Sequence, residues 1–203
     1  MSTTRRSTRR AKQAEATRTD ILRAARRLFS ERGYAATSMT DIAAEADVAV
    51  QTIYTSCGSK RDLVMALLDV IDEEGGVPEL SRELRAATEP RAAIAIAARL
   101  TRQIQERCGD VIRALNSAAA VEPDAAEATA EGQRRHRAGT ARLVRGLEAM
   151  GALREDISVD RAAAQASLLL NGAVYWELVG DHGWSYDEVE EWVRETLAAL
   201  LLR

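Results

Sequence analysis

The feature that most constrains this chain is a pair of short helical signals at residues 38–46 and 50–56, joined by a three-residue turn. Ser38 and Asp41 stand at the spacing of a capping box, which predicts that a helix begins just after Ser38. Each helix would have about two turns, and helices of that length are unstable alone in water. The two must therefore pack against each other and against a neighbouring helix, which predicts a compact helical unit.

The preceding segment, residues 17–32, supplies the neighbouring helix. Thr17 and Asp20 have the spacing of another capping box at its start, and Gly33 stands where the helix would end. Its apolar residues recur at helical spacing on one face and are Ile21, Leu22, Ala25, Leu28 and Phe29. Residues 1–16 carry five basic residues and no apolar stripe, so we expect a disordered basic arm there.

Composition and charge separate this N-terminal part from the rest of the chain. Aromatic residues are 4% of the sequence, and Ala and Leu dominate, so we expect an all-α fold. Residues 1–62 hold 12 Lys and Arg against 7 Asp and Glu, whereas residues 63–203 hold 16 against 24. A basic unit on an acidic body is typical of a nucleic-acid-binding protein, although an Arg-rich solvated helix face would give the same balance.

The remaining reactive residues argue against a metal site, a disulfide framework or catalysis. Cys57 and Cys108 lie far apart and near no cluster of histidines, so we expect two reduced thiols and no zinc. His136 and His182 stand in charged or loop contexts without a catalytic partner set, which predicts a protein that is not an enzyme and needs no cofactor. No apolar run has the length of a membrane span, and the Arg- and Ser-rich start lacks the apolar segment of a secretory signal. We therefore expect a cytoplasmic protein.

A motif runs in register through residues 29–63: F-x-x-x-G-Y, then T-S-x-x-x-I-A, then T-x-Y, then S-K-x-x-L. The residues that match it are Phe29, Gly33, Tyr34, Thr37, Ser38, Ile42, Ala43, Thr52, Tyr54, Ser59, Lys60 and Leu63. With this motif, residues 17–68 resemble the N-terminal DNA-binding domain of the TetR/AcrR family of bacterial transcriptional regulators. The resemblance implies a three-helix helix-turn-helix DNA-binding domain at residues 17–62. A helical ligand-binding and dimerisation domain would follow at residues 63–203.

The resemblance also implies contacts with double-stranded DNA. The residues expected to bind phosphates are Thr40, Tyr54 and Lys60. The residues expected to face the groove are Val50, Gln51, Thr52 and Thr55. These residue types suit the task, because Thr, Gln and Tyr contact phosphates and base edges and Val can contact a thymine methyl group.

Three residues depart from the family pattern. Asp47 replaces the glycine of the turn, Ala49 replaces the serine that caps the second short helix, and Cys57 replaces an aromatic residue. Asp tolerates the left-handed conformation better than most residues, and the missing cap costs about 1 kcal/mol. These departures keep an alternative open, in which the chain is a helical protein-interaction or dimerisation module with degraded DNA binding.

Two segments near the end of the chain predict a dimer interface. Residues 158–179 are unusually apolar, which is typical of a helix buried on more than one side. Residues 185–202 begin with a capping box of Ser185 and Glu188 and carry an apolar stripe. The resemblance implies that both helices pair with those of a second copy, and an intrachain hairpin is the alternative.

The sequence therefore predicts a homodimeric repressor that binds a palindromic operator and is released by a small molecule. In the family such effectors bind among the helices of the second domain. Polar groups within apolar surroundings make Asn116, Asn171 and Trp176 candidate residues of the effector pocket. A surface position or a hydrogen-bonded core position is the alternative for each of them.

Overall fold

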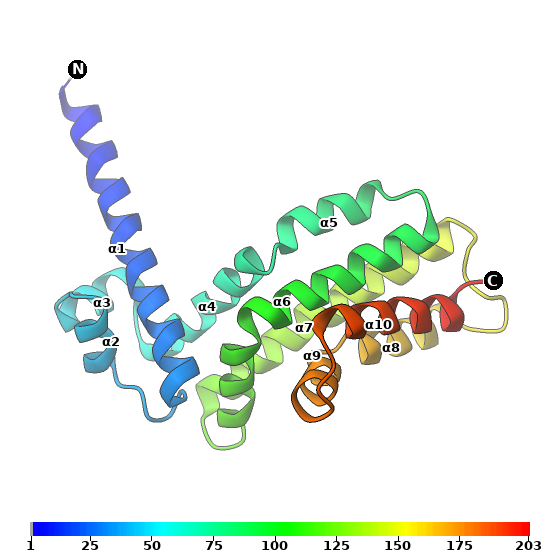
Figure 1. Ribbon diagram of the computed structural model, residues 1–203. Helices are drawn as coiled ribbons and strands as arrows, with labels where there is room; N and C mark the ends of the chain where they lie inside the picture. Colours follow the sequence, from blue (N-terminus) through cyan, green and yellow to red (C-terminus); the bar gives the residue numbers. More distant parts are fainter. Residues whose placement is uncertain (1) are drawn as a thin grey trace. The chain divides into compact units, whose positions relative to one another are not determined.

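The computed structural model describes residues 2–203 and, from residue 11 onward, their side chains (Figure 1). Within this range the chain forms helices and one isolated β-bridge between Leu153 and Leu202, so the predicted all-α class is confirmed. The chain divides into two compact units. Unit 1 consists of the residues up to Val70 together with Asp110–Ala130, and unit 2 consists of Ile71–Gly109 and Glu131–Arg203.

Unit 1 is built on its first helix. Its helices are α1 (Ser2–Arg32), α2 (Met39–Glu45), α3 (Val50–Cys57), most of α4 (Lys60–Glu74), the end of α6 (Pro90–Ala118) and the start of α7 (Pro123–Ala149). The buried side chains of α1 include Ile21, Ala25, Leu28 and Phe29, the apolar face that the sequence predicts, and α2 and α3 pack on this helix. We expected a domain boundary at residue 62, whereas unit 1 continues to Val70 and includes Asp110–Ala130.

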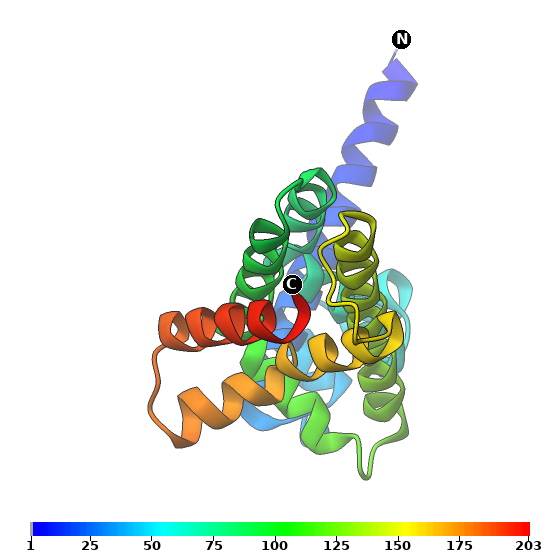
Figure 2. The same ribbon diagram turned by 90° about the vertical axis from the view of Figure 1, so that its right-hand side faces the viewer.

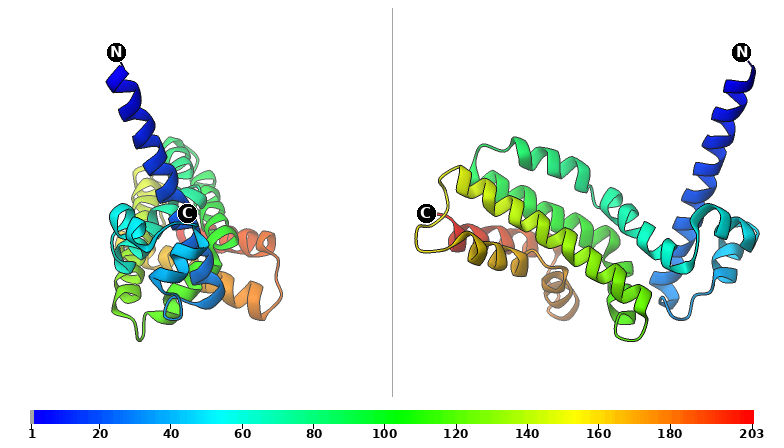
Figure 3. Two further views of the ribbon diagram at one scale, coloured as in Figure 1. Left: turned by 90° about the vertical axis from the view of Figure 1, so that its left-hand side faces the viewer. Right: turned by 180° about the vertical axis from the view of Figure 1, so that it is seen from behind.

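The first helix begins much earlier than we expected. Residues 1–16 were expected to be disordered, but α1 is helical from Ser2, and Met1 lies outside the described residues. The capping box predicted at Thr17 and Asp20 was also wrong. Thr17 lies inside α1, where its hydroxyl donates to the carbonyl oxygen of Gln13 at 3.0 Å. Residues 11–16 are all strong helix formers, so the helix continues across Thr17. Figure 3 (right) shows α1 extending past α2 and α3.

Unit 2 is a second bundle with its own core. Its helices are the end of α4, α5 (Val77–Ala86), most of α6, most of α7, α8 (Val159–Leu169), α9 (Gly172–Tyr175), the π-helix η1 (Trp176–Asp181) and α10 (Tyr186–Leu201). Side chains from α6, α7, α8 and α10 form the core, among them Ile94, Leu147, Ala166 and Leu197. Helices α8 and α10 pack against each other (Figure 2).

The helix expected over residues 158–179 is broken in the structure. α8 ends at Leu169, and Asn171 has an extended backbone with φ −81° and ψ 142°. The side-chain oxygen of Asn171 accepts a hydrogen bond of 3.0 Å from the N–H of Ala173 and so caps a new helix, α9. The helix expected over residues 185–202 is present as α10, with the predicted capping box of Ser185 and Glu188.

Candidate nucleic-acid interface

The turn between α2 and α3 contains a residue in the left-handed conformation. Asp47 has φ 52°, as expected for a position at which the family pattern has glycine. The N–H of Val48 donates to the carbonyl oxygen of Ala43 at 3.0 Å, which closes the turn over the end of α2. The turn is therefore kept, although the left-handed conformation costs a non-glycine residue roughly 1–2 kcal/mol.

Capping boxes start α2 and α4, while α3 has no side-chain cap. Ser38 and Asp41 exchange hydrogen bonds of 2.8 and 3.1 Å, and Ser59 and Asp62 exchange bonds of 2.8 and 3.2 Å. The hydroxyl groups of Ser38 and Ser59 also donate to the carboxylates of Asp41 and Asp62, and these bonds, together with those from the serine backbone N–H groups, hold the pKa of both carboxyl groups below the usual value. Ala49, the residue before α3, supplies no such bond. α3 therefore depends on packing to a greater degree than its two neighbours.

The inner face and the end of α3 are fixed to α1. Ile53 is 0% and Cys57 6% exposed, and the two helices are in contact. The guanidinium group of Arg18 in α1 donates to the carbonyl oxygen of Ser56 at 2.8 Å. Burial raises the pKa of the Cys57 thiol, and nearby Arg18 acts in the opposite direction. Cys57 is thus a buried packing residue, and Arg18 is a support for α3 that sequence reasoning missed.

The outer face of α3 carries most of the predicted DNA contacts. Tyr54 is 50% exposed, and Gln51 and Thr55 are also exposed. Val50 and Thr52 on the same helix are half-buried. The hydroxyl of Thr55 donates to the carbonyl oxygen of Gln51 at 2.8 Å, so its oxygen remains available to accept. Thr40 is exposed in the first turn of α2.

Lys60, the third predicted phosphate contact, has an intramolecular partner. Its Nζ donates to the carbonyl oxygen of Tyr34 at 2.7 Å and lies 4.0 Å from the centre of the Tyr34 ring. Burial lowers the pKa of Lys60, and the charges of Glu122 and Asp124 oppose this shift. The ammonium group is therefore held within unit 1.

Acidic residues at the start of α7 bind the same region, and sequence reasoning missed them. The hydroxyl of Tyr34 donates to Asp124 Oδ2 at 3.1 Å. Arg61 forms a two-point ion pair with Glu127, with distances of 2.8 and 2.6 Å. These contacts could not be predicted from the sequence, because the paired residues lie far apart in the chain and follow no common spacing.

The three predicted effector-pocket residues do not form one group within a unit. Asn116 belongs to unit 1, whereas Asn171 and Trp176 belong to unit 2. The side chain of Asn171 is exposed and caps α9. Trp176 donates its indole N–H to the side-chain oxygen of Gln105 at 3.0 Å.

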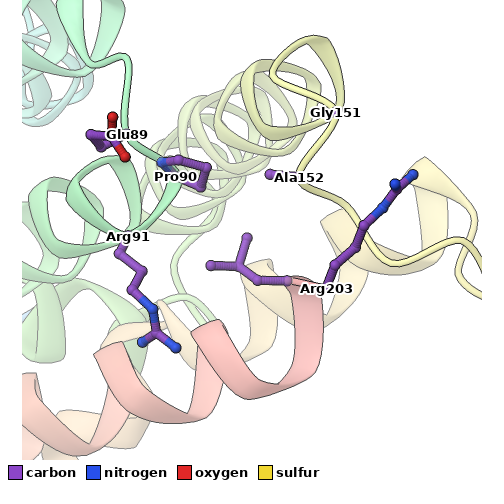
Figure 4. Close-up of a pocket in the computed structure, with 7 residues that line it drawn as sticks. Glu89, Pro90, Arg91, Gly151, Ala152 and Arg203 are labelled. Carbon is purple, nitrogen blue, oxygen red and sulfur yellow. The ribbon is translucent and has the colours of Figure 1, made fainter.

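A surface pocket of about 340 Å³ lies at another place in unit 2 (Figure 4). Its lining residues are Glu89, Pro90, Arg91, Gly151, Ala152, Leu202 and Arg203. None of the three predicted effector residues lines it.

The histidines and cysteines form no recognisable reactive centre. His136 Nε2 lies 2.9 Å from the carbonyl oxygen of Ser167, and His182 Nε2 lies 3.5 Å from Glu177 Oε1. Both cysteines are buried, and neither takes part in a disulfide. Within the described part of the chain, no group of three or more His, Cys, Asp or Glu residues is placed to hold a metal ion. No described helix combines the length and apolar character needed to cross a membrane.

Comparison with known proteins adds independent evidence for the first domain. Residues 21–67 match the family model of the bacterial regulatory proteins of the tetR family. The HTH-type transcriptional regulator TtgR of Pseudomonas putida is 44% identical over 61 residues. That match spans 30% of this chain and 29% of TtgR, less than a third of the length of the curated relative.

Solved structures share the fold over nearly the whole chain. A protein from Syntrophomonas wolfei named as a TetR-family transcriptional regulator has a TM-score of 0.77 at 19% identity, with 92% of this chain and 95% of that chain covered. The transcriptional regulator FadR of Bacillus subtilis, in complex with stearoyl-CoA, has a TM-score of 0.74 at 16% identity, with 90% and 98% covered. The motif of the first domain and its match to the family model agree that residues 21–67 form the domain that characterises the tetR family of bacterial regulatory proteins, and the solved structures share the fold of nearly the whole chain.

Proposed function

We propose that this protein is a sequence-specific DNA-binding transcriptional repressor. The observation that carries the proposal is the outer face of α3, which presents Gln51, Tyr54 and Thr55 to solvent while the inner face is packed on α1. Amide, phenol and hydroxyl groups contact phosphates and base edges in DNA. Val50 and Thr52 border this face, and Thr40 adds a hydroxyl from α2. The match to the tetR family model includes all of these residues.

The proposed repressor is a homodimer formed through the last helices of each chain. Leu168 of α8 is 70% exposed, and Trp192 and Leu200 of α10 are 39% and 37% exposed. Large exposed apolar side chains on two packed helices favour a binding partner, and a second copy would offer the same side chains in return. The operator would then be palindromic, since two equivalent α3 helices would read two half-sites.

A small-molecule effector would release the repressor from its operator in the cytoplasm. FadR of Bacillus subtilis, which shares the fold, was solved in complex with stearoyl-CoA, which supports effector binding in this chain too. We place the effector site among the helices of unit 2, where Asn171 and Trp176 remain the proposed contacts. Because Asn171 accepts from the N–H of Ala173 and Trp176 donates to Gln105, both side chains would have to change partners to bind an effector.

Selection of bound sequences from a random pool of double-stranded DNA tests the proposal. We expect a palindromic sequence to be enriched. The double variant Gln51→Ala, Tyr54→Ala should lose preference for it, while Gln133→Ala, which changes an exposed glutamine of unit 2, should bind like the wild type. Undiminished binding by the double variant would refute reading through α3.

The same experiment tests the alternative of an interaction module with degraded DNA binding. Asp47 in a left-handed turn and the uncapped start of α3 are the observations that favour this alternative. It predicts no measurable affinity for any DNA even at low salt, where contacts with phosphates are strongest.

A further inference from the structure

Lys60 is expected from the sequence to bind a DNA phosphate, whereas in the structure it contacts Tyr34 of the same chain. As a predicted phosphate contact it would need its ammonium group in solvent. In the structure Nζ is 2.7 Å from the carbonyl oxygen of Tyr34 and 4.0 Å from the centre of the Tyr34 ring. An ammonium group over the face of an aromatic ring is attracted by the electron-rich face. A DNA phosphate would compete with both interactions for this half-buried ammonium group.

The Tyr34 ring is itself held in place. The ring is 2% exposed and packs 5.1 Å from the ring of Phe29, measured between ring centres. Its hydroxyl donates to Asp124 Oδ2 at 3.1 Å, in the first turn of α7. Burial, the hydrogen bond to Asp124 and the nearby carboxylates all raise the pKa of Tyr34, so the phenol stays a hydrogen-bond donor. Tyr34 therefore cannot turn away from Lys60 without losing Asp124.

The charges at the start of α7 favour the same arrangement. Burial lowers the pKa of Lys60, whereas Glu122 and Asp124 stabilise its ammonium form. Glu127, on the same helix, is paired with Arg61 through two bonds and is not among the charges that act on Lys60. Asp124 thus acts on Lys60 in two ways, through its charge and through Tyr34.

We propose that Asp124 and Tyr34 are positioning residues that hold Lys60 away from DNA, and that Lys60 binds a phosphate only after it leaves Tyr34. This inference rests on the proposed DNA binding of α3 and adds a regulated contact to it. In this state the ammonium group of Lys60 would make no contact with a DNA phosphate. Any event that separates Asp124 from Tyr34 would release Lys60 and strengthen the hold on DNA without changing the residues of α3.

The variants Asp124→Asn and Tyr34→Phe test the proposal through the salt dependence of operator affinity. Asp124→Asn removes the negative charge that acts on Lys60, and Tyr34→Phe removes the hydroxyl that donates to Asp124. Both variants approximately keep the size of the side chain. We expect affinity at low salt to rise about 3- to 10-fold and the slope of log affinity against log salt to steepen by about 0.9, the value for one added phosphate contact. In a Lys60→Met background neither variant should produce this gain. Thermal melting establishes whether each variant is folded, and Asp124→Asn decides the question if Tyr34→Phe does not fold.

Glu127→Gln is the matched control. It removes one negative charge from the same helix, but the wild-type Glu127 pairs with Arg61 and not with Lys60 or Tyr34. An unchanged or weaker affinity in Asp124→Asn would overturn the proposal. So would a gain that persists with Lys60→Met, or an equal gain in Glu127→Gln. If the wild type binds no DNA at all, the proposed function itself fails, which is a different result from wild-type binding with an unchanged slope in Asp124→Asn.

Nuclear magnetic resonance provides a direct readout, since the sequence has two lysines, Lys12 and Lys60. In protein labelled with [ε-¹³C]lysine, the ring of Tyr34 should shift the ε-proton signal of Lys60 upfield from that of the exposed Lys12. We expect the Lys60 signal to lose this shift when operator DNA is added. A Lys60 signal that stays upfield in the complex would mean that the contact with Tyr34 is only structural.

Discussion

Arg18 of α1 donates a hydrogen bond of 2.8 Å to the carbonyl oxygen of Ser56, in the last turn of α3. The last carbonyl groups of a helix have no partner within the helix and lie at its negative end. A guanidinium group at this place donates to one of these carbonyl groups, and its positive charge interacts favourably with the negative end of the helix dipole. Arg18 therefore fixes the end of α3, while the start of the same helix has no side-chain cap.

Replacing Arg18 by methionine keeps an apolar stem and removes this bond. We expect the free energy of unfolding, measured with urea, to fall by about 1–2 kcal/mol, because the bond involves a charged donor. Operator affinity should also fall, since the end of α3 becomes less ordered. The slope of log affinity against log salt should stay at the wild-type value. A slope weaker by about 0.9 would show instead that Arg18 contacts a phosphate.

Replacing Ala49 by serine should stabilise the protein. Ala49 precedes α3 with φ −69° and ψ 144°, the extended conformation of a capping residue. A serine oxygen there could accept from a free N–H in the first turn, which is worth about 1 kcal/mol in urea unfolding. Ala44→Ser, at an exposed position inside α2, is the control and should be slightly destabilising. Equal effects of the two changes would contradict a capping role.

Replacing Leu168 by glutamate should break the proposed dimer. Leu168 is 70% exposed in the single chain, so the new charge would not harm the fold of one protomer. Buried against the same surface of a second copy, it would be strongly unfavourable. Analytical ultracentrifugation should show a monomer. Val121→Glu, at a residue of unit 1 that is 76% exposed, serves as control and should leave the dimer intact.

Two glycine-to-alanine changes should have opposite effects on stability. A Cβ at Gly172 would lie 2.6 Å from the side-chain nitrogen of Gln105, so Gln105 would have to move and lose its bond to Trp176. We expect a loss of about 1–2 kcal/mol from that bond. A Cβ at Gly146, inside α7, meets no atom within 4 Å, so alanine there should stabilise by about 0.5–1 kcal/mol. Differential scanning calorimetry measures both, and a destabilising Gly146→Ala would contradict this explanation.

Features encoded within a few residues were predictable from the sequence. The capping boxes at Ser38 and Ser185 depend on partners three residues away, and both are present. Asp47 was expected to be left-handed because of its place in a motif, and it is. The same local reasoning failed at Thr17, whose capping spacing competes with a strong helix-forming segment before it, and the helix continued.

Features that depend on residues far apart in the chain were not predictable. The position of Lys60 depends on Tyr34, 26 residues earlier, and that of Tyr34 depends on Asp124, 90 residues later. No helical period connects them, so only the folded chain brings them together. The helix break at Asn171 was not predicted for a different reason. The residues around it are apolar and favour one continuous helix, so the capping role of a single asparagine within them was not recognised.

The left-handed Asp47 has a consequence for protein engineering. Within residues 38–58 the capping box of α2 is offset by a strained turn and an uncapped α3, so packing on α1 must supply much of the stability of this segment. A peptide of these residues should be unstructured, and a transplant of α2 and α3 onto another scaffold should fail unless α1 is carried with them. Exchanging the DNA specificity of this protein is therefore better done by changing single side chains of α3 than by moving the motif as a cassette.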